Sequence, residues 1–234
     1  MPIQQSAMLP MKPGLTRFTW DFRTGGLQKI PNTFVLGADY RGHRVAQGNY
    51  KARMSYGEES STVDIVILDP PDISVSKQAW SAQQSLIENI EGRINELHKS
   101  INSTMEMNGK IKSILKQIGS SEGTEDLKDA GKKLEKKISD WQSTVIELRQ
   151  SGFQDALNWP AGMNAEFFLI KSSLDTYDPS VPESYRTRFE DLDAAWTKHK
   201  AVLEEIMDKD VKAFNELYRS KDLPALDAPE KEVN

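Results

Sequence analysis

The side chains best suited to metal or acid–base chemistry are scattered in this sequence. His43 lies in a glycine-rich stretch, His98 follows Leu97, and His199 falls within a helical pattern. A zinc site needs several ligands at short, fixed spacings, and the chain has no cysteine and no H-E-x-x-H motif. The sequence therefore predicts no metal site, and each histidine is expected to be hydrogen-bonded or partly exposed.

The carboxylates do not form a recognisable catalytic pair either. Asp21, Asp39 and Asp64 lie in the N-terminal part, but their spacing does not place two of them across a cleft, as a glycosidase requires. Sequence motifs for a nucleophilic serine, a phosphate-binding loop and a dinucleotide-binding turn are missing as well. We therefore predict no catalytic residue, no cofactor and no enzymatic activity for this chain.

Aromatic side chains offer one alternative chemistry, the stacking of sugar rings. Trp20, Tyr40 and Tyr56 could form such a platform, although aromatic residues that alternate along a strand more often belong to a core. Carbohydrate binding by these three residues is the alternative hypothesis.

Bulk properties exclude some partners. The net charge is −5, which gives no basic face for general nucleic-acid binding. No apolar run approaches the roughly 18–20 residues of a membrane span. The N-terminal residues lack the basic and apolar segments of a signal peptide. We therefore expect no nucleic acid and no membrane span.

Helical periodicity dominates the chain after residue 73. Between Leu86 and Ile118 apolar residues recur at alternating steps of three and four, as in helices that pack along other helices, including coiled coils. Further helices are predicted from Thr124 to about 151, from 163 to 177, and after a Ser180–Glu183 capping box. The register of the last helix slips near residues 208–210. Short connections favour an antiparallel four-helix bundle.

Two positions interrupt the apolar seam of the first helix. Thr104 and Asn108 occupy it, and His199 lies on the seam of the last helix. Such residues can make a buried polar contact that fixes register or partner choice. Alternatively, the helix emerges from the bundle there and the seam faces water.

Strand periodicity is confined to the N-terminal part. Residues 17–23 alternate aromatic with polar side chains, and a short strand is expected at 33–36. Residues 50–56 and 63–67 also alternate around a Gly57 turn, which predicts a hairpin. Tyr50 stands at the start of its strand, where a tyrosine of an immunoglobulin-like sandwich can bond backbone through its hydroxyl.

Two segments, GLTRFTWDFR at 14–23 and QGNYKA at 47–52, carry a family resemblance. Together with Asn158-Trp159-Pro160 and residues 210–215 they resemble the C-terminal region of exported bacterial proteins with sortilin-like (VPS10/BNR-repeat) β-propellers, labelled glycosyl hydrolases. The resemblance covers most of 14–218. It implies an immunoglobulin- or fibronectin-like module followed by helices, export from the cytoplasm, and an accessory role. No catalytic residue is carried over.

The predicted fold class is α+β, a partial immunoglobulin/fibronectin-like antiparallel sheet followed by a bundle of long helices. The expected divisions are an arm at 1–13, a partial β-sandwich at 14–69, the four-helix bundle at 73–219 and a polar tail at 220–234. The predicted function is structural or protein-interacting. The expected partner is the parent's β-propellers or another protein, with a glycan as the alternative.

Overall fold

The computed structural model describes residues 14–69, 71, 76–119 and 122–221. A two-stranded antiparallel sheet precedes the helices, which confirms the α+β class. The predicted arm at 1–13 and most of the tail at 220–234 lie outside the described residues. The elements in chain order are β1 (Gly48–Tyr56), β2 (Glu59–Ile67), α1 (Lys77–Ile118), α2 (Glu125–Val145), the 3-10 turn η1 (Phe153–Leu157), α3 (Met163–Leu174), α4 (Glu183–Glu205), the π-helix η2 (Ile206–Val211) and α5 (Lys212–Arg219).

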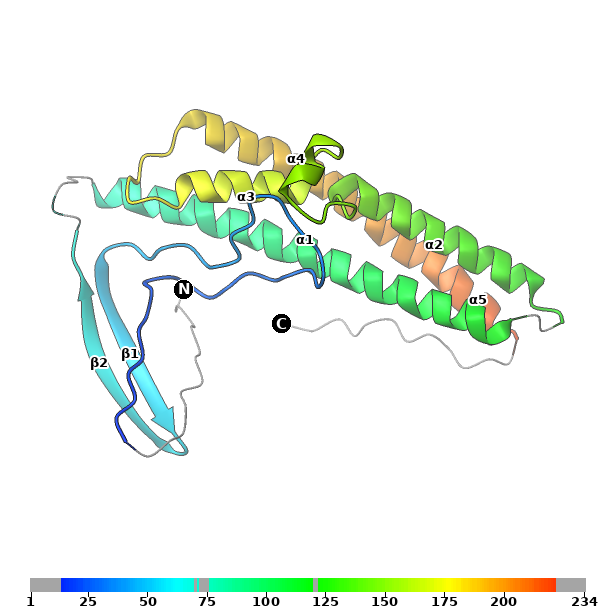
Figure 1. Cartoon of the computed structure of the whole chain (residues 1–234), viewed down its shortest axis with the longest axis horizontal. Coiled ribbons are helices and arrows are strands. Elements are labelled where there is room, and N and C mark those ends of the chain that lie inside the picture. The colour runs from blue at the N-terminus through cyan, green and yellow to red at the C-terminus, as the bar shows by residue number, and fades with distance from the viewer. Residues whose placement is uncertain (1–13, 70, 72–75, 120–121, 222–234) are drawn as a thin grey trace.

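Helix α1 runs along the whole helical part of the molecule, and α2, α3 and α4 pack against it (Figure 1). It begins after Ser76, whose side chain accepts a hydrogen bond from the Ala79 N–H, and ends at Gly119, where φ is 46°. Its 42 residues span about 63 Å at 1.5 Å per residue. The predicted seam is buried from Ile87 to Ile118, except that Leu115 is only partly buried.

The remaining helices form two further rods beside α1. Figure 1 shows α3 lying in line with α2, so that these two helices together follow α1, and α4 with α5 runs back along them. Four segments were expected side by side, whereas three rods are observed. The reason is length, because α2 has 21 residues and α3 has 12, against 42 in α1.

Three predicted helix ends are wrong. Helix α3 stops at Leu174, and not at residue 177, because its C-cap Asp175 leaves the helical conformation with a ψ of 60°. Helix α2 stops at Val145, and not near residue 151, because Ile146 adopts an extended backbone with φ −141° and ψ 143°. Helix α4 begins at Glu183 with Pro182 at its N-cap, so Ser180 does not form the predicted capping box.

The predicted register slip is confirmed. Helix α4 passes into α5 through η2, a π-helical segment that ends at Val211. The buried positions Ile206 and Val211 are five residues apart, and burial then resumes at Phe214 and Tyr218. A π-turn accommodates one extra residue in a helix, which is what this spacing requires.

Gly131 of α2 lies where two helices approach closely. A Cβ atom there would come within 2.8 Å of Leu115 Cδ2 and 3.2 Å of Phe214 Cε2. A larger residue at this position would therefore require the Leu115 side chain to move.

The hairpin is confirmed, whereas the two other predicted strands are wrong. Gly57 has a φ of 58° at the first position of the two-residue turn between β1 and β2, where a type II′ turn requires it. In contrast, residues 17–22 form no strand and have no partner strand in the described part of the chain. Phe22 has a φ of 57°, outside the strand region, and only Arg23 bridges to Arg44. Residues 33–36 belong to loop and turn.

The hairpin projects away from the helices near the start of α1 (Figure 1). Among the described elements, β1 and β2 contact each other and no helix. As predicted, the Tyr50 hydroxyl donates a hydrogen bond to backbone, here the Ala46 carbonyl at 2.6 Å. The immunoglobulin-like identity of this region stays a prediction.

Candidate functional site

Four charged side chains and one histidine, buried between the N-terminal loop and the helices, form a polar cluster. We call it the ionic cluster: Arg23, His43, Glu91, Lys171 and Asp175, each at most 9% exposed. The loop supplies the first two, α1 supplies Glu91, α3 supplies Lys171, and Asp175 caps the end of α3. Buried charges are stable only when paired, so this cluster ties the loop to two helices.

Asp175 is the acceptor at one end of the cluster. Its carboxylate lies 2.6 Å from Arg23 Nη1 and accepts a hydrogen bond from the Arg44 N–H at 2.9 Å. Burial alone would raise the pKa of Asp175. The hydrogen bonds from Arg44 and Arg23, with the charges of Arg23 and Lys171, outweigh burial and hold the pKa below its usual range. The carboxylate is therefore kept ionised at a helix C-terminus, where a negative charge is otherwise unfavourable.

Glu91 is the acceptor at the other end. Its Oε2 lies 2.8 Å from His43 Nδ1, and its Oε1 lies 3.6 Å from Lys171 Nζ. The Lys171 ammonium also donates to the Arg41 carbonyl at 2.8 Å. In a catalytic site, a carboxylate orients a histidine whose other ring nitrogen activates a nucleophile. Here the Thr24 hydroxyl and the Glu91 carboxylate both approach the same His43 atom, Nδ1, with Thr24 Oγ1 at 3.4 Å. The contacts of this pair join chain segments to each other.

An open depression of about 430 Å³ lies beside the ionic cluster on the loop. Arg23 and Arg41 line it, but both are engaged, Arg23 with Asp175 and Arg41 with Asp39 at 2.7 Å. The Arg41 hydrogen bond holds the pKa of Asp39 far below its usual range. The two arginines of the depression are thus already neutralised by neighbours, whereas Lys29 lies with its Nζ 5.6 Å from the centre of the Tyr40 ring. Its lining residues are Asp21, Arg23, Thr24, Gly26, Leu27, Lys29, Tyr40, Arg41 and Gly42.

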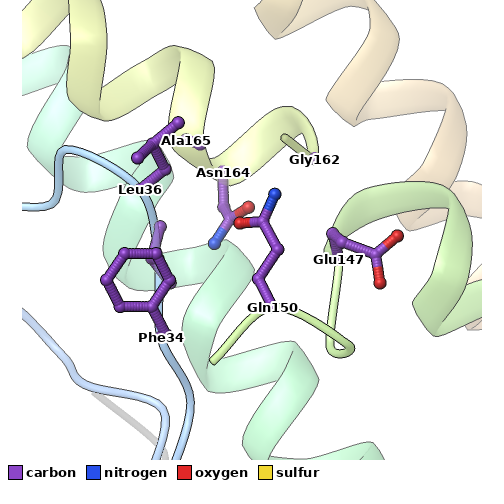
Figure 2. A pocket seen from close by; sticks show the side chains of 8 residues that line it. Phe34, Leu36, Glu147, Gln150, Gly162, Asn164 and Ala165 are labelled. Atoms are coloured by element: carbon purple, nitrogen blue, oxygen red, sulfur yellow. The ribbon is translucent and has the colours of Figure 1, made fainter. Parts of the chain in front are cut away.

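A second hollow separates the loop from the start of α3 (Figure 2). The amides of Asn164 and Gln150 lie next to each other there, and Glu147 is directed away from them. Asn164 is buried and its Nδ2 has no hydrogen-bond partner, whereas Gln150 donates to the Trp159 carbonyl. The hollow has no room for a water molecule, so it offers no ligand site.

The three aromatic residues proposed for carbohydrate are not brought together. Trp20 lies 6.0 Å from the Tyr50 ring at the base of the hairpin, and Tyr56 is exposed beside the hairpin turn. Tyr40 instead packs edge-on against Phe168, with 5.0 Å between ring centroids. Its hydroxyl is buried without a hydrogen-bond partner, and burial raises its pKa.

The polar seam residues Thr104 and Asn108 are buried, so the alternative in which they face water is wrong. Gln142 of α2 donates from Nε2 to Thr104 Oγ1 at 2.9 Å, and Asn108 Nδ2 donates to Ser139 Oγ at 3.2 Å. These bonds link α1 to α2 in one register. His199 lies apart and half-buried, with its Nδ1 at 3.2 Å from Thr144 Oγ1.

Replacing Thr104 by valine should destabilise the fold by about 1–3 kcal/mol, because it leaves the buried Gln142 amide without its acceptor. Urea unfolding of Thr104→Val measures this loss. Thr197→Val is the matched control, since its exposed hydroxyl bonds only its own helix. The double variant Thr104→Val/Gln142→Leu should recover part of the loss, and no recovery would contradict the pairing.

His98 is a buried residue that sequence reasoning expected to be hydrogen-bonded or partly exposed. It is fully buried, its Nδ1–H donates to the Gln28 carbonyl at 2.7 Å, and its Nε2 has no hydrogen-bond partner. Burial lowers the pKa of His98, although the Gln28 hydrogen bond opposes this. The neutral ring is therefore the form that the fold accommodates.

The stability of the protein should fall in mild acid because of His98. Below the ordinary pKa of 6.5 the unfolded chain binds a proton at His98, whereas the folded chain binds it only at lower pH. Protonation therefore stabilises the unfolded state relative to the folded state. The stability that neutral His98 contributes is fully present above pH 6.5 and is lost as the pH falls towards the lower pKa of His98 in the folded protein. Urea midpoints measured between about pH 7.5 and 5.5 should decline less steeply in His98→Gln than in the wild type. Equal slopes in both proteins would contradict this assignment.

Comparison of the chain with protein-family models, with curated proteins and with solved structures gave no match. Within the described ranges, no group of three or more histidine, aspartate or glutamate side chains is placed to hold a metal ion. No helix in the described part combines the length and hydropathy needed to cross a membrane.

Proposed function

We propose that this chain is a non-catalytic accessory region of a larger exported protein and docks on another protein surface through its hairpin. One face of the hairpin supports this proposal. In the register of the sheet, the apolar members of one alternating set lie on this face, and we call them the apolar hairpin face: Tyr50, Ala52, Met54, Tyr56, Val63 and Ile65. Glu59 and Ser61 share the face near the turn, opposite Tyr56 and Met54.

The apolar hairpin face has little cover. Met54 is 59% exposed, Tyr56 69% and Val63 58%, while Trp20 covers only the base at Tyr50. A two-stranded hairpin is marginally stable alone in water, and a contiguous apolar patch of this kind marks an interaction surface. An accessory docking role therefore fits this exposed apolar face.

The ionic cluster gives the hairpin a fixed base. His43 and Arg44 lie just before β1 and are held by Glu91 and Asp175. The hairpin thus leaves the bundle from an anchored point, as a docking arm requires. The resemblance to β-propeller proteins suggests that the parent's propellers are the docking surface.

The proposal is tested by the mass of the purified chain in sedimentation equilibrium across a concentration series. An unoccupied apolar face should cause weak self-association, which Met54→Ser/Val63→Ser abolishes. The matched pair Arg53→Ser/Thr62→Val lies on the opposite face of the hairpin and should leave the association unchanged.

A titration with glycans tests the alternative. Saturable glycan binding that is lost in Trp20→Ala, with the fold intact and the chain monomeric throughout, would overturn docking in favour of carbohydrate recognition. The Trp20 ring is half-buried and packs at an angle against the Tyr50 and Phe22 rings, so the fold of this variant should be checked by circular dichroism.

A further inference from the structure

Both outer edges of the hairpin are unpaired within the described part of the chain. The two-residue turn makes Tyr56 and Glu59 the first hydrogen-bonded pair, and such pairs alternate along an antiparallel ladder. The intervening residues of β1 therefore turn their backbone N–H and C=O groups outward. We call them the basic edge: Asn49, Lys51, Arg53 and Ser55.

The basic edge carries two cations on an acidic protein of net charge −5. Lys51 faces Asp64 across the hairpin at 3.5 Å, but both side chains are about three-quarters exposed, so this pair is weak. Arg53 lies opposite Thr62. A strand added to this edge would meet positive charge at alternate residues.

The same charges disfavour pairing between copies of this chain. With the strands fully overlapped, an antiparallel pair of two β1 edges would set Lys51 against Arg53, and a pair of two β2 edges would set the two copies of Asp64 diagonal to each other. If β1 paired with the β2 of another copy, a free edge would remain at each end of the assembly. The result would be an open chain of copies and not a closed dimer. Assembly of this chain with itself through the sheet edges is thus disfavoured.

We propose that the basic edge receives an extended segment of another protein in which acidic and apolar side chains alternate, and this rests on the docking function proposed above. The acidic side chains would face Lys51 and Arg53. The apolar ones would widen the apolar hairpin face beside Ala52 and Met54. A third strand would give the hairpin the width that a stable sheet needs, by strand addition.

The test uses three labelled peptides of about nine residues, the length of β1. One alternates valine with glutamate, one alternates valine with lysine, and one keeps the glutamates but has proline in place of two valines. Fluorescence anisotropy with the whole chain should show saturable binding of the first peptide, about tenfold tighter than of the other two. Hydrogen exchange should slow at the outward amides of Lys51 and Arg53 when this peptide binds.

Lys51→Glu/Arg53→Glu should reverse the preference towards the lysine peptide. Lys132→Glu/Lys133→Glu makes the same change of charge on the exposed face of α2 and should preserve it. Equal binding of the proline peptide, an unreversed preference, or no slowing at the two amides would overturn strand addition. If no peptide binds while self-association still depends on Met54 and Val63, strand addition fails and the docking function stands.

Discussion

Replacing Asp175 by asparagine is expected to lower the free energy of unfolding by about 3–5 kcal/mol, because it leaves Arg23 buried without a counter-charge. The Arg23 side chain is 6% exposed and its Nη1 otherwise bonds only the Gly42 carbonyl. The loss appears as a lower urea midpoint with an unchanged slope. Since the folded pKa of Asp175 is depressed, the difference from wild type should be full above about pH 4 and shrink as the pH falls below it.

Asp140→Asn is the matched control for this variant. Asp140 pairs with Lys136 one helical turn away on the exposed surface, where such a pair contributes about 0.5 kcal/mol or less. A buried pair can also be replaced by apolar side chains, so Arg23→Met/Asp175→Leu should be more stable than Asp175→Asn. If Asp175→Asn unfolds at the same midpoint as Asp140→Asn, the ionic cluster does not hold the loop.

Truncation of Phe168 to alanine should cost about 3–5 kcal/mol. Phe168 is fully buried in α3 and touches both Tyr40 of the loop and His98 of α1, at centroid distances of 5.0 Å and 5.7 Å. Its removal opens a cavity where three segments meet. Thermal or urea unfolding measures the loss.

Phe153→Ala provides the same chemical change at an exposed position. Phe153 is 73% exposed and contacts Phe34 edge-on, so its loss should stay near about 0.5 kcal/mol. Similar losses for both phenylalanines would show that the loop, Tyr40 and α1 do not pack as described. In addition, Phe168→Ala should speed proteolysis of the loop more than Phe153→Ala does.

The helical part of the molecule was predictable because its information is local. The seam of α1 and the slip before Val211 are both visible in the spacing of apolar residues. Helix ends were less predictable. Leu148 continues the apolar spacing of α2 by sequence, yet the chain has already turned at Ile146.

The N-terminal loop could not be predicted from periodicity. Phe18 and Phe22 alternate as in a strand, but both are half exposed, and the segment is held by charge and not by a buried sheet. The partners of the ionic cluster lie far apart in sequence, 152 residues in the case of Arg23 and Asp175. Only long-range packing brings them together.

One local signal for the ionic cluster was present. Glu91 lies four residues after Ile87, and Lys171 four residues after Phe167, so each charged residue occupies a position on the buried face of its helix. A charge in such a place requires a partner of opposite sign from another segment. This signal indicates that a buried ion pair exists but does not identify the partner.

The π-helical segment between α4 and α5 sets the rotational phase of the last eight helical residues. An α-helix turns by about 100° per residue, so one residue more or fewer between Ile206 and Val211 would swing Phe214 away from Gly131. The length of this segment is therefore more constrained than its composition. Substitution of its outward-facing side chains should be tolerated, whereas a single insertion or deletion there should detach α5 from α2.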